Sequence, residues 1–275
     1  GGLVAALAGK RLKIRSVLTV MGGELIHEPR AGYGKRCRPI AGNLARLGAH
    51  RATVVNVSSA YHRNRILTEQ SRLDPMVIPL GTDARLFSDD AAPRQLAGAP
   101  SVLCVGSLVA VKGHRLIFDA LARTSVQCPT LHLHVVGQGV LDGVLRDAVA
   151  RLGLASRVTF HGHIEHHKLP AWYRGADFCI LGSLFENHGM TILEAAACGR
   201  LTVGSAVGLM PELCPAQLLA APGDSVALAH VLQLAATEQT IRQGLASDLP
   251  QTVRARYSLE CTVRAFESLY ERPLP

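Results

Sequence analysis

The sequence predicts an α/β fold with two parallel-sheet units, and three observations support this. Between residues 101 and 236, short apolar runs alternate with longer helical stretches at the spacing of βαβ units. Hydrophobic residues make up 48% and charged residues 18% of the 275, a balance typical of a globular chain. A polar, proline-containing segment at 89–100 separates this alternation from a smaller set of elements. We therefore expect a doubly wound sheet after that segment and a smaller sheet before it.

The first unit begins with a short helix at 2–8 and a buried strand at 16–21 that runs into Gly22 and Gly23. Because α/β proteins place ligand-facing turns after such strands, both glycines are candidate binding residues. A loop rich in Gly, Pro and Arg follows at 27–39. The remaining predicted elements are a helix at 40–48, a strand at 52–57, a helix capped by Ser58 or Ser59, and a strand at 76–79.

The second unit, which follows the 89–100 segment, is predicted to form a regular series of strands and helices. The predicted strands lie at 101–105, 131–136, 157–160, 177–182 and 201–203. The predicted helices lie at 114–124, 140–152, 168–174, 190–198, 224–236 and 258–271. In a doubly wound sheet, ligands bind at the carboxyl ends of the strands, so the loops after these strands are the candidate sites.

Composition limits the partners and the compartment. The formal net charge of +8 suits an anion such as a nucleoside diphosphate, an anionic membrane surface or a nucleic acid. Nucleic acid is disfavoured because aromatic residues are only 4% of the chain. The seven cysteines form no C-x-x-C pair, which indicates free thiols in a reducing, cytoplasmic compartment. Apolar runs all fall short of a membrane span.

The stretch LFENHGMTILEAAACG, at 184–199, carries the main candidate site. An apolar strand leads into a tight loop and then into a helix, with Gly189 at the bend. The first turn of that helix has unpaired amides at Gly189, Met190 and Thr191 and a partial positive charge. We therefore expect an anion, and a phosphate in particular, to bind there.

Two carboxylates, Glu186 and Glu194, bracket this helix tip. Carboxylates accept hydrogen bonds from sugar hydroxyls and are poor phosphate ligands, so hydroxyl-rich groups are expected on both sides of the phosphate. A nucleotide sugar has this layout. The residues alone leave a second interpretation open, in which Glu186 is a solvated loop residue and Glu194 an exposed helix residue.

The glutamate pair in ENHGMTILEAAACG resembles the signature of the retaining glycosyltransferases of the group 1 type, which have the GT-B fold. The resemblance runs from about residue 15 to residue 272. It continues, in the order and spacing of the family, through VIPLGTDARLF (77–87), VLCVGSLVAVKGH (102–114), HVVGQG (134–139) and RVTFHGHI (157–164).

The resemblance implies two Rossmann-like parallel-sheet domains, of which the N-terminal one is incomplete by about half a domain before residue 1. It places a partial acceptor-side domain at 1–90, a nucleotide-sugar-binding domain at 91–255, and a helix at 256–275 that crosses back to the first domain.

The resemblance also implies roles for particular residues. Lys112 would stabilise the departing diphosphate, Glu186 would hold hydroxyls of the transferred sugar, and Glu194 would bind the ribose. The family's reaction needs no metal or other cofactor. Other positions expected near the donor are Asn187, His188, Gly189, Met190, Thr191, Gly106, Ser107, Gly137, Ile164, Gly22 and Gly23.

Two positions depart from the family pattern. Ser107 stands where the family has an arginine that is paired with the lysine, and Met21 stands where it has a histidine. Loss of a cation weakens stabilisation of the leaving group, unless Arg115 or Arg85 substitutes. A non-catalytic or weakened nucleotide-binding remnant is therefore the second hypothesis. The third, a nucleotide-sugar epimerase, fits the glutamate spacing less well.

The histidines at 161, 163, 166 and 167 suggest a zinc-binding site as an alternative. We disfavour it, because Glu165 alone adds a ligand at suitable spacing. The leading hypothesis is therefore transfer of a hexose from a nucleoside diphosphate sugar to a saccharide, lipid-linked or small-molecule acceptor, with retention of configuration. The basic surface would allow peripheral docking at the inner face of a membrane.

Overall fold

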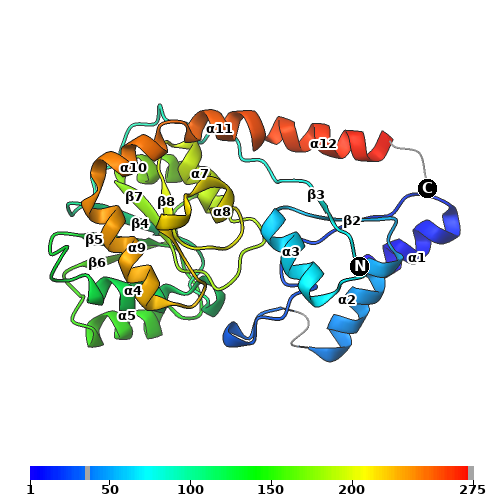
Figure 1. Cartoon of the computed structure of the whole chain (residues 1–275), viewed down its shortest axis with the longest axis horizontal. Helices are drawn as coiled ribbons and strands as arrows, with labels where there is room; N and C mark the ends of the chain where they lie inside the picture. The colour runs from blue at the N-terminus through cyan, green and yellow to red at the C-terminus, as the bar shows by residue number, and fades with distance from the viewer. Residues whose placement is uncertain (35–37, 272–275) are drawn as a thin grey trace.

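Two parallel β-sheets organise the chain, and the computed structural model describes residues 1–34 and 38–271 (Figure 1). The smaller sheet has the order β1-β2-β3. Its strands are β1 Val17–Thr19, β2 Val54–Val57 and β3 Met76–Val77. Its helices are α1 Gly2–Leu12, α2 Pro39–Arg51 and α3 Ala60–Glu69, with a short 3-10 turn, η1, at Pro29–Ala31.

The larger sheet has the order β6-β5-β4-β7-β8-β9, with every neighbouring pair parallel. The chain moves outward from β4 through β5 to β6 and then returns to build β7, β8 and β9 on the other side. Ligands of such sheets bind where the order reverses, here beyond the ends of β4 and β7. The strands are β4 Ser101–Val105, β5 His132–Val136, β6 Val158–Gly162, β7 Phe178–Leu181, β8 Thr202–Ser205 and β9 Leu219–Ala220.

Helices form a layer on each face of the larger sheet. On one side α4 packs against α5 and α9, and on the other α7 packs against α6 and α11 (Figure 1). The helices are α4 His114–Arg123, α5 Asp142–Arg151, α6 Leu169–Gly175, α7 Met190–Ala197, α8 Met210–Leu213, α9 Ser225–Thr237, α10 Gln239–Ala246, α11 Leu249–Arg256 and α12 Leu259–Glu271. Short 3-10 turns are η3 Ala110–Lys112, η4 His166–Lys168 and η5 Ala216–Leu218.

The core explains why the central strands read as continuous apolar runs. All four residues of β7, Phe178–Leu181, are buried because helices cover both faces of the sheet. The alanines of α7, at 195–197, are also buried, and their small side chains let this helix approach the sheet closely. Full burial of a side chain as large as that of Phe178 contributes about 1.5–3 kcal/mol. This packing holds the β7–α7 connection in one position.

The last helix, α12, leaves the larger sheet and runs alongside the smaller one (Figure 1). The Thr262 hydroxyl donates to the Pro79 carbonyl at 2.9 Å, and the Arg15 guanidinium donates to the Leu269 carbonyl. A bridge between Thr82 and Ser258 adds a backbone connection. The C-terminal helix therefore contacts the N-terminal half of the chain.

The predicted strands and the main helices are present with shifts of a few residues at their ends. Ser59, not Ser58, caps α3, since its hydroxyl oxygen accepts from the His62 amide at 3.1 Å. The α8, β9, α10 and α11 elements were not predicted. Two of them, β9 and α8, span only two and four residues, too short for a periodic pattern. Residues 35–37 of the expected loop at 27–39 lie outside the described residues.

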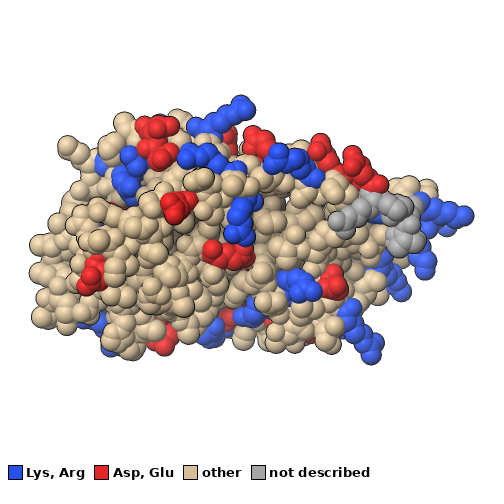
Figure 2. Space-filling model, turned by 45° about the horizontal axis from the view of Figure 1, so that its top comes forward, with Lys and Arg blue, Asp and Glu red and all other residues tan. Residues whose placement is uncertain are grey.

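The surface charge is uneven. Figure 2 shows Lys and Arg side chains gathered at the end of the molecule that carries α1. Within the described residues, no helix combines the length and the apolar character needed to cross a membrane.

Candidate functional site

The β7–α7 loop, residues 182–189, lies beyond the carboxyl end of β7, at the reversal of strand order. Gly189 ends the loop with a φ of 89°, and a Cβ there would lie 2.5 Å from Cδ1 of Ile192. Only glycine fits this position without strain. Met190 and Thr191 follow as the first residues of α7 and stay partly exposed. The amides of this helix tip are therefore accessible to a ligand.

A cavity of about 290 Å³ opens at this helix tip, between the two halves of the chain. The larger half supplies the loop, the start of α7 and the η3 turn, and the smaller half supplies the opposite wall. The lining residues are Met21, Tyr33, Leu80, Val111, Lys112, Phe185, Glu186, Asn187, His188, Gly189, Met190 and Thr191.

Glu186 and Lys112 meet in this cavity. The Lys112 ammonium donates to Oε1 of Glu186 at 2.6 Å, and the Ser183 hydroxyl donates to the same oxygen at 2.7 Å. The Glu186 carboxylate is only 8% exposed, so the cation compensates a charge that burial would otherwise penalise. Among the described residues no hydrogen bond engages Oε2, which leaves that oxygen as an acceptor for a ligand.

Glycines place Lys112 at the end of β4. Gly113, with a φ of 62°, turns the chain from η3 into α4, and a Cβ there would lie 2.0 Å from the Gly182 carbonyl oxygen. A Cβ on Gly137 would lie 1.9 Å from the Gly106 carbonyl oxygen. The loops after β4, β5 and β7 thus approach one another at backbone distance. The structure brings Gly106, Gly137 and Lys112 together.

Asn187 and His188 line the cavity, but their polar side-chain atoms bind the smaller half. Nδ2 of Asn187 donates to the Met21 carbonyl at 2.9 Å. The ring nitrogens of His188 lie 2.8 Å from the Ser58 carbonyl oxygen and 2.7 Å from that of Leu80. The side-chain polar atoms of these two residues are therefore used within the protein, and their main-chain carbonyls accept from the Ser59 hydroxyl and the Leu209 amide.

Glu194 has surroundings separate from those of Glu186, and it does not line the cavity. It is 5% exposed, and its Oε2 accepts from the Tyr173 hydroxyl at 2.7 Å. Nε2 of His166 lies 3.1 Å from Oε1. Burial, together with the Glu194 charge, raises the pKa of Tyr173 well above its usual value, so this phenol stays a donor. Glu194 is thus a buried acceptor with partners on both oxygens.

Six other predicted positions also lie outside the cavity lining: Gly22, Gly23, Gly106, Ser107, Gly137 and Ile164. Ser107 is exposed, and Ile164 packs partly against the core. The Gly22 amide donates to Glu24 at 2.8 Å, and the Gly23 amide donates to the Tyr33 hydroxyl at 3.1 Å. Both amides of the glycine pair are therefore used within the protein.

Several residues of the site were missed by sequence reasoning. Tyr33 lines the cavity from the loop at 27–39, where no periodicity marks it. Phe185 packs against it, with ring centroids 5.8 Å apart. Tyr173 and His166, the partners of Glu194, come from α6 and η4. An aromatic residue in a glycine-rich loop was the one signal available for Tyr33.

Lys112 is the one Lys or Arg among the cavity-lining residues of the described chain. Arg115 pairs with Asp119 on α4 at 3.4 Å, and Arg85 is exposed and absent from the lining. Neither arginine therefore occupies the place of the second cation that the family has beside its lysine.

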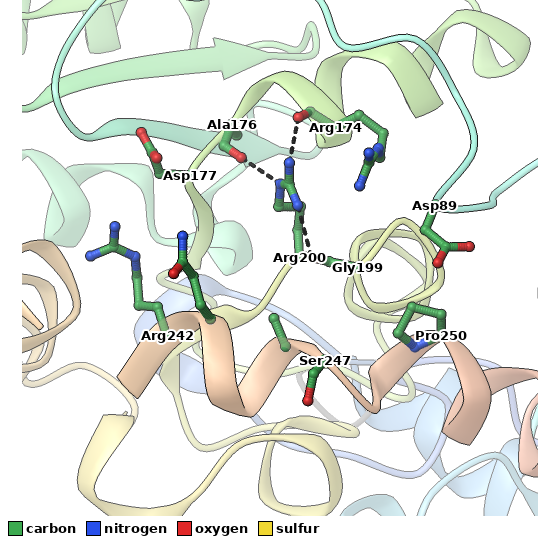
Figure 3. A pocket seen from close by; sticks show the side chains of 11 residues that line it. Asp89, Arg174, Ala176, Asp177, Gly199, Arg200, Arg242, Ser247 and Pro250 are labelled. Carbon is green, nitrogen blue, oxygen red and sulfur yellow. Dashed lines mark hydrogen bonds between the residues drawn. The ribbon is translucent and has the colours of Figure 1, made fainter. Parts of the chain in front are cut away.

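A second cavity, of about 270 Å³, lies at the opposite end of α7 (Figure 3). Arg200 lines it and donates to the carbonyls of Ala176 and Arg174, at 2.7 Å each, and of Gly199 at 3.0 Å. Arg242 likewise donates to carbonyls at the end of α9. These guanidinium groups cap helix ends, and the cavity adjoins the amino ends of β7 and β8, away from the edge where ligands of such sheets bind.

The histidines near β5 and β6 form a stacked row. Nδ1 of His134 lies 2.9 Å from Nε2 of His161, and Nε2 of His132 lies 2.8 Å from the Thr159 hydroxyl. Burial is the main cause that lowers the pKa of His161 to about 4. No group of three or more His, Cys, Asp or Glu residues in the described part of the chain is arranged to hold a metal ion.

Comparison with known proteins gives curated relatives for part of the chain. The D-inositol 3-phosphate glycosyltransferase of Arthrobacter sp. (strain FB24) is 31% identical over 142 residues, covering 48% of this chain and 34% of that protein. The GDP-mannose-dependent alpha-(1-6)-phosphatidylinositol monomannoside mannosyltransferase of Mycolicibacterium smegmatis is 30% identical over 192 residues, covering 63% of this chain and 50% of that protein. These matches span about a third to a half of each relative.

The fold has close counterparts among solved structures. Anabaena HepE, solved in complex with UDP and glucose, superposes with a TM-score of 0.80 over 98% of this chain and 76% of that chain, at 22% identity. The two-sheet architecture is therefore that of the GT-B glycosyltransferases. The family described as glycosyl transferases group 1 matches residues 99–237, which hold β4 to α9 and the Glu186 to Glu194 stretch. The chain belongs to this family of glycosyl transferases.

Proposed function

We propose that this chain transfers a hexose from a nucleoside diphosphate sugar to an acceptor hydroxyl, with retention of configuration at the anomeric carbon. The observation that carries the proposal is the Lys112–Glu186 pair at the tip of α7, within the cavity between the two halves. The pair offers one cation, one unengaged carboxylate oxygen and a helix N-terminus at the same place. A pyrophosphate joined to a sugar matches this set of groups.

In this proposal the reaction proceeds by positioning and charge stabilisation. The bond between the anomeric carbon and the diphosphate oxygen breaks, and the acceptor oxygen forms a new bond on the same face. The acceptor proton passes to the departing phosphate oxygen. Lys112 and the amides of Met190 and Thr191 stabilise the growing negative charge, while Oε2 of Glu186 holds a hydroxyl of the sugar. No metal or other cofactor takes part.

Glu194 is the proposed ligand of the ribose hydroxyls. A bound ribose would compete with His166 for the carboxylate, because His166 is exposed and Tyr173 is fully buried. Tyr173 would then keep its hydrogen bond to Glu194, while the exposed His166 imidazole would move away from the carboxylate.

The relatives include an enzyme named for GDP-mannose, and the Anabaena structure contains UDP, so both bases are candidates. We propose a saccharide, lipid-linked or small-molecule acceptor that approaches from the smaller sheet, and a cytoplasmic site of action. The basic end near α1 supports contact with an anionic membrane surface.

The test is a binding and turnover screen. Purified protein is heated with UDP, GDP and their sugars, and stabilisation by one of them is expected. An excess of 100 times the dissociation constant adds about 2.7 kcal/mol of stability. Release of the free nucleoside diphosphate from the matching sugar, with or without an acceptor, then reports turnover. Absence of binding to every nucleotide at millimolar concentration would refute the proposal.

A second candidate is a weakened nucleotide-binding relative, and one observation favours it. Lys112 is the one Lys or Arg of the described cavity lining, and Ser107 supplies no charge in place of the missing arginine. Tight binding of a nucleoside diphosphate without any transfer or hydrolysis of its sugar would select this candidate. Replacement of Ser107 by Arg would then be expected to raise the rate of transfer.

A further inference from the structure

A buried cluster of hydrogen bonds joins the β7–α7 loop to the smaller half of the chain. We call it the latch and define it by Ser58, Ser59, His62, Asn187 and His188, all of which are at most 8% exposed. In addition to its bond to Met21, Nδ2 of Asn187 donates to the Ser58 hydroxyl oxygen at 3.0 Å. The Asn187 main-chain carbonyl accepts from the Ser59 hydroxyl, and its Oδ1 pairs with Nδ1 of His62.

The donors and acceptors around Asn187 and His62 fit one arrangement. Because Oδ1 of Asn187 can only accept, Nδ1 of His62 carries the proton and donates to it. Burial lowers the pKa of His62 to about 4, so the ring is neutral near pH 7 and its second nitrogen has no proton. That nitrogen, Nε2, has no hydrogen-bond partner in the described structure. A reversed amide would place an oxygen against the Met21 carbonyl, acceptor against acceptor, and a reversed ring would place a carbon opposite Asn187.

The latch spans parts of the chain that are far apart in sequence. Asn187 and His62 are separated by 125 positions, and Asn187 and Met21 by 166. Asn187 lies directly after Glu186 and two positions before Gly189. The path of the β7–α7 loop therefore depends on contact between the two halves, as does the direction in which Glu186 points.

We propose that Asn187 and His62 are positioning residues, and that their latch gives the β7–α7 loop its binding geometry only when the two halves are in contact. Neither side chain touches the donor in this proposal, so Asn187 and His62 act through Glu186 and the tip of α7. The effect on donor binding rests on the proposed function. The latch itself is a property of the free chain.

Acid opens the latch. A proton on Nε2 of His62 adds a buried charge with no acceptor, beside Phe185, whose ring centroid lies 5.4 Å away. Glu24 favours the charged ring and Arg65 opposes it. On the other side of the latch, burial lowers the pKa of His188, while hydrogen bonds to the Leu80 and Ser58 carbonyls and the charge of Glu212 favour its protonated form. Since the pKa of His62 is lowered, the latch is complete above pH 6.5 and is lost as the pH falls toward 4.

Hydrogen exchange of the free chain, followed by mass spectrometry, tests the latch without any nucleotide. Asn187→Asp replaces the Nδ2 donor by an oxygen that faces the Met21 carbonyl, so exchange at 58–63 and 186–191 should rise at least about tenfold. Exchange in β4 and β5 should stay unchanged. Asn64→Asp, the same change at an exposed position of α3, should leave both segments as in the wild type. Unchanged protection of both segments in Asn187→Asp would overturn the proposal.

Ser59→Ala is a milder second variant. It tests the latch if Asn187→Asp disturbs the wider fold and therefore also raises exchange in β4. It removes one hydroxyl from the smaller half, yet it should raise exchange at 186–191, more than a hundred positions away. Wild-type exchange at 186–191 in Ser59→Ala would then overturn the latch.

The pH dependence of hydrogen exchange in two His62 variants distinguishes a positioning role from a purely structural one. His62→Asn keeps a donor where Nδ1 stands and cannot titrate, whereas His62→Ala removes the donor. His62→Asn should restore wild-type exchange at pH 7.5 and remove the increase that the wild type shows at pH 5, after normalisation for intrinsic rates. His62→Ala should stay open at both pH values. Equal behaviour of the two variants would refute the positioning role.

Kinetics separate the latch from the proposed function. For a donor sugar that the wild type uses, Asn187→Asp should raise KM at least about tenfold, with a smaller change in kcat. Unchanged KM combined with increased exchange would refute the coupling to donor binding. If the wild type uses no nucleotide sugar, the proposed function fails, and the exchange experiment still decides on the latch.

Discussion

The Lys112 ammonium lies 2.6 Å from Oε1 of Glu186, although the two residues are 74 positions apart. The lysine comes from the loop after β4 and the glutamate from the loop after β7, the two strands between which the sheet order reverses. Each partner keeps hydrogen-bonding capacity that the other does not use. The ammonium has further N–H groups for a phosphate, and the carboxylate has Oε2 for a hydroxyl.

Glu186→Gln should abolish most of the transfer while leaving the fold intact. The amide keeps the shape of the side chain but no longer pairs as an anion with Lys112, and we expect the rate to fall about 10²–10³-fold. Turnover of the donor sugar and circular dichroism are the measurements. Glu260→Gln, the same change at an exposed position of α12, serves as the control. Equal activity in the two variants would exclude a role for Glu186.

Gly189→Ala should destabilise the chain and distort the start of α7. The φ of 89° and the contact of 2.5 Å with Ile192 together predict a cost of about 1–3 kcal/mol. Urea unfolding measures this cost. Gly244→Ala in α10 is the matched control, because a Cβ there meets nothing within 4 Å and alanine favours the helix. The account would be contradicted if both variants were as stable as the wild type.

Tyr173→Phe should weaken the structure around Glu194. The phenol donates to a carboxylate that is 5% exposed, so its loss leaves a buried acceptor without this partner and costs about 1–3 kcal/mol. Tyr270→Phe on the exposed face of α12 removes the same hydroxyl at the surface and should change little. Equal unfolding midpoints for the two variants in urea would show that the Tyr173 bond contributes nothing.

His114 should make the stability of the chain sensitive to acid. Burial lowers its pKa to about 4, and neither ring nitrogen has a hydrogen-bond partner within the described residues. The unfolded chain therefore takes up the proton first, and stability is lost as the pH falls from 6.5 toward 4, by at most about 3 kcal/mol. His114→Leu should flatten this loss, measured by urea unfolding at pH 7.5 and pH 5. His230→Leu, at an exposed position, should leave the loss unchanged.

The sequence was informative wherever local pattern and tertiary environment agree. The apolar run of β7 is buried within the sheet, and it was recognised from composition alone. Gly189 was placed at the bend before α7, and it has a positive φ. The α10 and α11 helices were missed because each spans only eight residues; the buried residue of α10 is the charged Arg242, and Pro250 lies in the first turn of α11.

Sequence reasoning was less informative about the site, because contacts between distant segments leave no local trace. Lys112 and Glu186 could be named from the resemblance, but their direct ion pair could not be foreseen. The turn of Asn187 and His188 toward the smaller half depends on Met21, Ser58 and Leu80. Tyr33 reaches the cavity from a loop without periodicity.

A crystal structure of the chain soaked with the nucleoside diphosphate that stabilises it most would test the central claim most directly. We predict that the terminal phosphate lies within hydrogen-bond distance of the Lys112 ammonium and of the Met190 and Thr191 amides, with Oε2 of Glu186 facing the space for the sugar. A diphosphate bound away from the tip of α7 would contradict the account.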